Sequence, residues 1–155
     1  MPTKKLTAIA LAAVFAAGAT FAFAQTITTD PALASLSPAE MVAKRQAIMK
    51  ENGAGLKRSG SLSGADAVAA ADHLIANFSN LTILFPEGSA VGDTEALPAV
   101  WEKNDAFQAI LARSIAAANQ MKAAAEAGDA AAYGASIKAM GATCGECHQT
   151  FRQQS

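Results

Sequence analysis

Near its C-terminus the chain reads Cys144-Gly145-Glu146-Cys147-His148, and both fold and function can be inferred outward from this stretch. Two cysteines three residues apart lie on the same side of a helical turn, so their thiols can add to the two vinyl groups of one porphyrin. The imidazole that follows is placed to bind the iron, for which histidine is a common proximal ligand. The C-x-x-C-H spacing therefore predicts one covalent haem c, held by Cys144 and Cys147 and ligated by His148.

Two other uses of the cysteine pair stay open as weaker alternatives. A redox-active C-x-x-C of the thioredoxin type would lie near a βαβ pattern, and the sequence has no convincing strand. A structural zinc ion needs four closed ligands. The chain offers only Cys144, Cys147, His148 and His73, and two of these are adjacent residues with poor geometry for one tetrahedral ion.

The motif continues the apolar face of a helix predicted over residues 130–153. Tyr133, Ile137, Met140 and Phe151 recur with the motif residues at spacings of three and four, which is the period of one helix face. Because this face points to the core of the protein, a haem attached to it is expected to lie inside the protein rather than on its surface.

Three more helices are predicted upstream, over residues 38–56, 63–84 and 99–127, with a loop over 85–97. The first begins at a capping box formed by Ser37 and Glu40. Its stripe is Val42, Arg45, Met49, Gly53 and Leu56, and that of the third helix is Phe107, Ile110, Leu111, Ser114, Ile115, Ala118 and Met121. Four amphipathic helices with short links predict an all-α, antiparallel four-helix bundle with covalently bound haem c over residues 37–155, after an extended lead-in over 25–36.

The N-terminus predicts export. Lys4 and Lys5 precede an apolar run over residues 6–17, and Ala22-Phe23-Ala24 forms a small-x-small cleavage site, the pattern of a secretory signal peptide. The run is too short to span a bilayer as a helix. We therefore expect residues 1–24 to be removed after Ala24, and the mature protein to be periplasmic without stable membrane insertion.

The placement of the motif on the last helix of an all-α chain resembles the class II cytochromes c, the cytochrome c′ family, including its low-spin Met/His-ligated members. The resemblance extends from about Ser37 to Ser155. It is carried by residues 44–50 in the first helix, residues 84–89, residues 98–101 and the C-terminal stretch 144–152, which ends with an aromatic residue and a cation.

This resemblance implies roles for residues outside the motif. Arg45 and Gln46 would approach the haem propionates, Met49 the distal face of the iron, and Arg152 the proximal face; Met41 is a weaker rival of Met49. The resemblance also implies a homodimer that forms through the first two helices.

The leading functional prediction is a periplasmic single-electron carrier that serves periplasmic redox partners. The alternative is a five-coordinate haem protein that binds small gases such as nitric oxide or carbon monoxide, and a third possibility is a bundle that uses haem as a structural staple. Ligation by Met49 would fill the sixth position, raise the potential and favour electron transfer. The sequence shows no catalytic acid/base pair, nucleophile–base pair or phosphate loop, so no enzyme is expected, and no basic patch for nucleic acid.

Overall fold

The computed structural model describes residues 27–154. The predicted signal peptide and its cleavage site lie outside these residues. The elements are η1 (Pro31–Ser35), α1 (Pro38–Ser59), α2 (Gly64–Leu81), α3 (Ala99–Glu102), α4 (Asn104–Glu126) and α5 (Ala130–Phe151).

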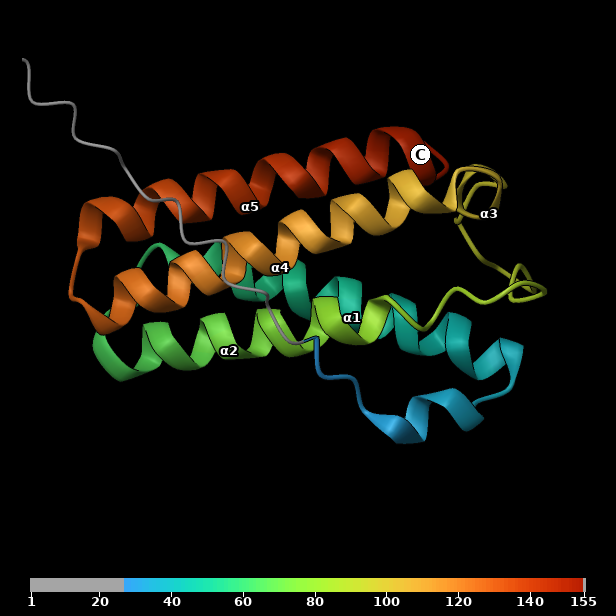
Figure 1. The fold of residues 1–155 in the computed structure, drawn as a ribbon, viewed down its shortest axis with the longest axis horizontal. Helices are drawn as coiled ribbons and strands as arrows, with labels where there is room; N and C mark the ends of the chain where they lie inside the picture. Colours follow the sequence, from blue (N-terminus) through green and yellow to red (C-terminus); the bar gives the residue numbers. More distant parts are fainter. Residues whose placement is uncertain (1–26, 155) are drawn as a thin grey trace, which may run out of the picture.

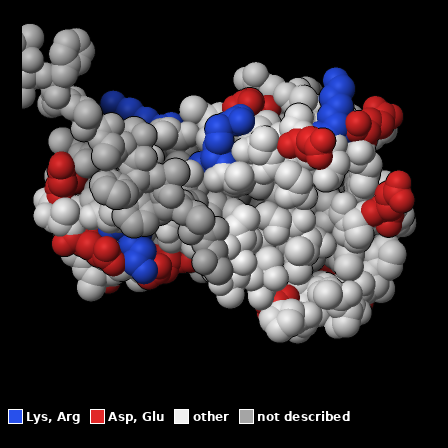
Figure 2. Space-filling view, in the orientation of Figure 1, with Lys and Arg blue, Asp and Glu red and all other residues white. Residues whose placement is uncertain are grey.

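The four long helices α1, α2, α4 and α5 run antiparallel to their neighbours in sequence and form one bundle (Figure 1). The segment that joins α2 to α3 lies at the end of the bundle where α5 finishes. The predicted four-helix fold is thus confirmed. Within residues 27–154, no helix combines the length and apolar character needed to cross a membrane. Figure 2 shows acidic and basic side chains intermingled toward the two ends of the same face.

Local sequence signals set several helix ends. At the start of α1, the Ser37 backbone N–H donates to Glu40 Oε2 at 2.8 Å, and the Glu40 N–H donates to Ser37 Oγ at 3.4 Å, which is the predicted capping box. At the junction of α4 and α5, Gly128 adopts φ +66°, a left-handed conformation that glycine adopts without steric cost. Asp129 then accepts a hydrogen bond from the Ala132 N–H and caps α5.

The prediction of one continuous helix over 99–127 is wrong at Lys103, where φ −122° and ψ 43° interrupt the chain between α3 and α4. The side-chain amide of Asn104 donates to the Val100 carbonyl at 3.2 Å and so occupies the acceptor that its own backbone N–H would use in a continuous helix. Trp101 Nε1 donates to the Pro86 carbonyl at 3.0 Å and ties α3 to the loop before it.

The C-terminal end of α5 also differs from the prediction, because Arg152 turns to an extended conformation and forms an isolated antiparallel bridge with Ala96. Leu97 N–H donates to the Phe151 carbonyl and Gln153 N–H to the Glu95 carbonyl. The loop before α3 is therefore bound to the end of α5. Smaller differences are that α1 extends to Ser59, α2 ends at Leu81, and the lead-in contains η1 instead of being extended throughout.

The apolar core lies between α2, α4 and α5, with a smaller contribution from α1. All seven positions of the predicted stripe of α4 are buried. The stripe of α5 is buried at Tyr133, Met140, Cys147 and Phe151 and half-buried at Ile137, Cys144 and His148. Cys144 and His148 belong to the site described next, whereas Ile137 packs against the core.

Candidate haem-binding site

Two cavities adjoin one another between α1 and α5. The first, of about 480 Å³, extends to the loop before α3 and is called the loop-side cavity. The second, of about 380 Å³, extends toward α2 and α4 and is called the bundle-side cavity. Met49, Cys147 and His148 line both. The residues that the sequence singles out therefore stand where the two cavities meet.

The two motif cysteines lie on α5 as free thiols. Cys147 is 9% exposed, whereas Cys144 is half-buried and lines the bundle-side cavity. Burial raises the pKa of the Cys147 thiol to about 11, helped by the nearby Cys144 and Glu146, and burial also raises the pKa of the Cys144 thiol. Both thiols are protonated at neutral pH, which is unfavourable for a redox-active cysteine pair.

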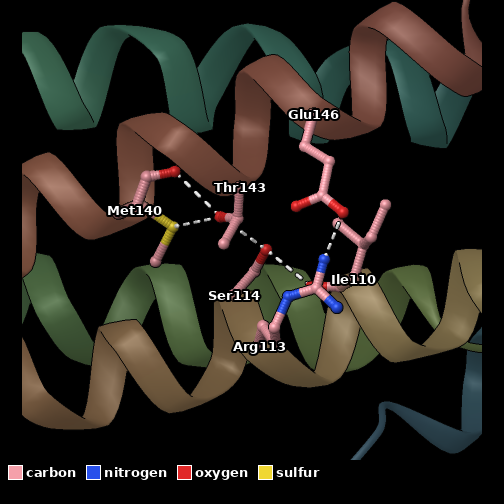
Figure 3. A network of polar contacts seen from close by, with 6 residues as sticks. All are labelled: Ile110, Arg113, Ser114, Met140, Thr143 and Glu146. Carbon is pink, nitrogen blue, oxygen red and sulfur yellow. Dashed lines mark hydrogen bonds and ion pairs between the residues drawn. The ribbon is translucent and has the colours of Figure 1, made fainter.

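Polar contacts between α4 and α5 hold the motif segment in position (Figure 3). Ser114 Oγ on α4 donates to Thr143 Oγ1 at 2.9 Å, directly before Cys144. Arg113 forms an ion pair with Glu146, one of the two residues between the cysteines of the motif. Thr143 Oγ1 also donates to the Met140 carbonyl at 2.8 Å. These contacts fix the turn of α5 that carries both thiols against α4.

The stripe predicted for α1 faces the cavities rather than the apolar core. Val42, Arg45 and Met49 line the loop-side cavity, and Met49, Gly53 and Leu56 line the bundle-side cavity. The core is instead contacted from the neighbouring face of α1, where Ile48 has no exposed surface. Helix α1 therefore has two buried faces: one lines the cavities and the other packs against the core.

Arg45 holds the loop between α2 and α3 against α1. Its side chain is 4% exposed. Nη1 donates to the Leu84 carbonyl at 3.1 Å and to Ser89 Oγ at 3.0 Å, and Nη2 donates to the Ser89 carbonyl at 3.0 Å and to Thr94 Oγ1 at 3.2 Å. Only the Nε N–H of Arg45 donates to none of these four acceptors. The predicted contact of Arg45 with a haem propionate stays a prediction.

Replacing Arg45 by lysine is expected to destabilise the holoprotein by about 1–3 kcal/mol, because an ammonium group cannot reach all four loop acceptors and leaves buried ones unpaired. Urea unfolding followed by circular dichroism measures the change. Arg58→Lys, at an exposed position near the end of the same helix, is the matched control and should change stability by less than about 0.5 kcal/mol. Equal stability of the two variants would show that the loop contacts of Arg45 contribute little.

Aromatic rings continue from Arg45 along the wall of the loop-side cavity. The Arg45 guanidinium carbon lies 4.4 Å from the centroid of the Phe85 ring, a cation–π arrangement. Phe85 packs edge-to-face on Phe107 at 4.8 Å, and Phe107 on Phe151 at 5.3 Å. These rings join α1, the loop, α4 and α5 into one rigid wall beside His148.

Cations gather at the loop-side cavity. Arg45, Lys50 and Arg152 line it, opposed by a single carboxylate, Glu95. Arg152 Nε is 3.8 Å from Glu95 Oε2 and is buried without a hydrogen-bond acceptor. Gln46, also at this cavity, is exposed and donates to the Asp93 carbonyl at 3.1 Å. An excess of positive charge with unused N–H donors suits the carboxylates of a haem.

The electrostatic surroundings of His148 favour its neutral form. Burial lowers the pKa of the imidazole, the positive charge of Arg152 lowers it further, and Glu95 opposes this shift. The neutral ring is the form that ligates a metal ion. His73, by contrast, is a half-exposed residue of α2 that pairs with Glu51 and lines neither cavity.

The residues present fit a haem c. Two thiols and an imidazole stand together on α5, a thioether faces the same cavities from α1, apolar and aromatic side chains form the walls, and the cations are concentrated at one end. Among the described residues, no group of three or more His, Cys, Asp or Glu is placed to hold a metal ion.

Some site residues have no signal in the sequence. Asn52 and Glu95 line the cavities but belong to no motif. The sequence does not single them out, because a polar residue type on a helix or loop does not indicate which groups pack against it. Phe107 was expected as part of the α4 core stripe and proves to line the loop-side cavity as well.

Comparison with known proteins agrees with this geometry. The family described as Cytochrome C' matches residues 40–152. A cytochrome c′ of Pararhodospirillum photometricum is 36% identical over 124 residues, which cover 76% of this chain and 99% of that protein. A cytochrome c-554 of Cereibacter sphaeroides is 50% identical over 74 residues, 46% of this chain and 48% of that protein. The crystal structure of cytochrome c′ from Thermochromatium tepidum superposes with a TM-score of 0.70 at 27% identity, and the match covers 77% of this chain and 98% of that one.

Proposed function

Because the chain belongs to the cytochrome c′ family, we propose that it carries single electrons between periplasmic redox partners and is not itself an enzyme. The cofactor of the proposal is one haem c, bound covalently through Cys144 and Cys147, which both family membership and the cavities on either side of the motif support. The haem supplies the redox-active iron. His148 is the proposed proximal ligand, Arg45 and Gln46 are the proposed propionate-side residues, and Arg152 is the proposed residue beside the proximal face.

The observation that supports electron transfer over gas binding is the position of Met49. This residue of α1 lines both cavities together with His148 of α5, so the two side chains approach the shared region from different helices. Met49 is half-buried and its thioether is flexible. A sulfur ligand on the iron favours the reduced state and leaves no open coordination position for a gas.

We expect Met49→Ala to convert the ferric protein from a low-spin to a high-spin spectrum. The wild type should show a sulfur-to-iron charge-transfer band at the red end of the visible spectrum and should bind carbon monoxide slowly or not at all. The variant should lose the band and bind the gas readily, because removing the thioether opens the sixth position.

The matched control for this test is Met41→Ala. Met41 is a buried core residue on the same helix that lines neither cavity. Its replacement should lower stability and leave the spectrum unchanged. A wild-type ferric spectrum that is already high-spin, with carbon monoxide binding that Met49→Ala does not alter, would refute the proposed ligation.

Binding of small gases is the second candidate function. It is favoured by the apolar extension of the bundle-side cavity, where Leu56, Phe78 and Ile110 line a space beyond Met49. Such a space would hold nitric oxide or carbon monoxide if Met49 did not ligate the iron. The homodimer through α1 and α2 stays a prediction from the family resemblance, and so does export of the mature chain to the periplasm.

A further inference from the structure

Asn52 carries a buried hydrogen-bond donor without an acceptor. The residue is 6% exposed, and its Nδ2 has no hydrogen-bond partner. It lies on α1 one turn after Met49, and both residues line the bundle-side cavity. A buried amide N–H that loses its water without gaining a partner costs free energy, so the missing acceptor needs a physical explanation.

The surrounding contacts determine which end of the Asn52 amide is free. Asn77 Nδ2 on α2 donates to Asn52 Oδ1 at 2.8 Å and to Glu51 Oε2 at 3.3 Å, and it lies 3.2 Å from His73 Nε2. Exchanging the oxygen and nitrogen of Asn77 would place its oxygen against the Glu51 carboxylate, which is repulsive. The carboxylate therefore fixes Asn77 as the donor and Asn52 Oδ1 as the acceptor, and Asn52 Nδ2 is left as the free group.

Few acceptors are available to Asn52 around the bundle-side cavity. The cations that suit haem carboxylates line the loop-side cavity instead. The two hydroxyls at the bundle side, Ser114 and Thr143, belong to α4 and α5, where they contact each other and carbonyls of their own helices, and neither lies on α1 with Asn52. The remaining acceptor on the α1 side is the thioether sulfur of Met49, three residues from Asn52 along the helix, where side chains are neighbours.

We propose that Asn52 is a positioning residue for Met49, with its free N–H donated to the Met49 sulfur of the holoprotein. This inference rests on the proposed role of Met49 as the sixth ligand. Glu51 orients Asn77, and Asn77 in turn fixes the amide of Asn52. The Asn52 amide then keeps the Met49 thioether directed toward the region that both cavities share beside His148. An N–H bond to the sulfur withdraws electron density from it, which favours the reduced protein.

The test uses the holoprotein and the variant Asn52→Leu, which keeps the branched shape of the side chain and removes the donor. We expect a lower reduction potential, a shift or weakening of the sulfur-to-iron band, and a lower midpoint of thermal unfolding. Asn119→Leu is the matched control, because Asn119 is a half-buried residue of α4 that donates to the Ile115 carbonyl and lines neither cavity. It should leave the potential and the band unchanged.

A double-mutant cycle with Met49→Leu tests the contact itself, because neighbouring groups that interact give non-additive changes in stability. In the Met49→Leu background, Asn52→Leu should cost less stability than in the wild type, and the cost that remains is that of the lost Asn77 hydrogen bond. Additive effects would overturn the proposal. So would an Asn52→Leu holoprotein as stable as the wild type, because under the proposal the substitution removes two hydrogen bonds, one from Asn52 Nδ2 to the sulfur and one from Asn77 to Asn52 Oδ1.

The cycle also separates this inference from the proposed function. A high-spin wild type would refute ligation by Met49, yet coupling between the two residues would still support the contact. A low-spin wild type without coupling would refute the contact and leave electron transfer standing. If Asn52→Leu does not fold, Asn52→Ala, which fits a helix without steric conflict, gives the same comparison.

Discussion

Replacing Cys144 and Cys147 together by alanine is expected to abolish covalent haem. The two thiols are the only cysteine side chains of the chain, and both line the cavities on α5 beside His148. Acid–acetone extraction should leave the haem on the wild-type polypeptide and remove it from the double variant. Intact mass should show the added haem only in the wild type.

The two single variants are the internal controls of this experiment. Each retains one thiol at the site, so each is expected to keep one thioether bond and to resist extraction in part. Cys147→Ala should have the larger effect, because Cys147 is the more buried thiol and lines both cavities. Wild-type protein that loses its haem on extraction would show that attachment through these cysteines is wrong.

Protein without haem is expected to lack sharp, cooperative unfolding. Removing the haem leaves the loop-side cavity of about 480 Å³ without its filling. At about 24 cal/mol per Å³, a cavity of that size corresponds to an upper limit on the order of 10 kcal/mol. That is comparable with the entire stability of a typical domain, about 5–15 kcal/mol. The double cysteine variant, expressed without haem, provides the protein for this measurement.

The loss is expected to be concentrated in α1. This helix faces the cavities with one of its two buried sides, whereas α2, α4 and α5 share the apolar core. Amide hydrogen exchange should therefore lose protection in α1 first, while α4 keeps part of its protection. Cooperative unfolding of the haem-free protein at the midpoint of the holoprotein would contradict this expectation.

Much of the fold follows from local patterns. The stripe of α4 is buried at every predicted position. Residues that recur at helical spacing lie on one face of the helix, and this face packs against the core. The capping box at Ser37 starts α1 as predicted, since its partners lie only three residues apart. The covalent haem follows from five residues, because the chemistry of attachment requires two thiols and an imidazole at that spacing, whereas the family follows from the place of this motif on the last helix together with Arg45 and Met49.

The tertiary structure decided what depends on partners distant in sequence. Arg45 binds a loop about 40 to 50 residues away, Arg152 leaves α5 to pair with Ala96, and α3 separates from α4 where Asn104 takes a backbone carbonyl. Asn52 gains its free donor only from the arrangement of Glu51 and Asn77. Helical periodicity indicates that a face is buried but not which residues or groups cover it. The sequence alone therefore determined the helices and the attachment chemistry. The three-dimensional packing decided which polar groups surround the haem site.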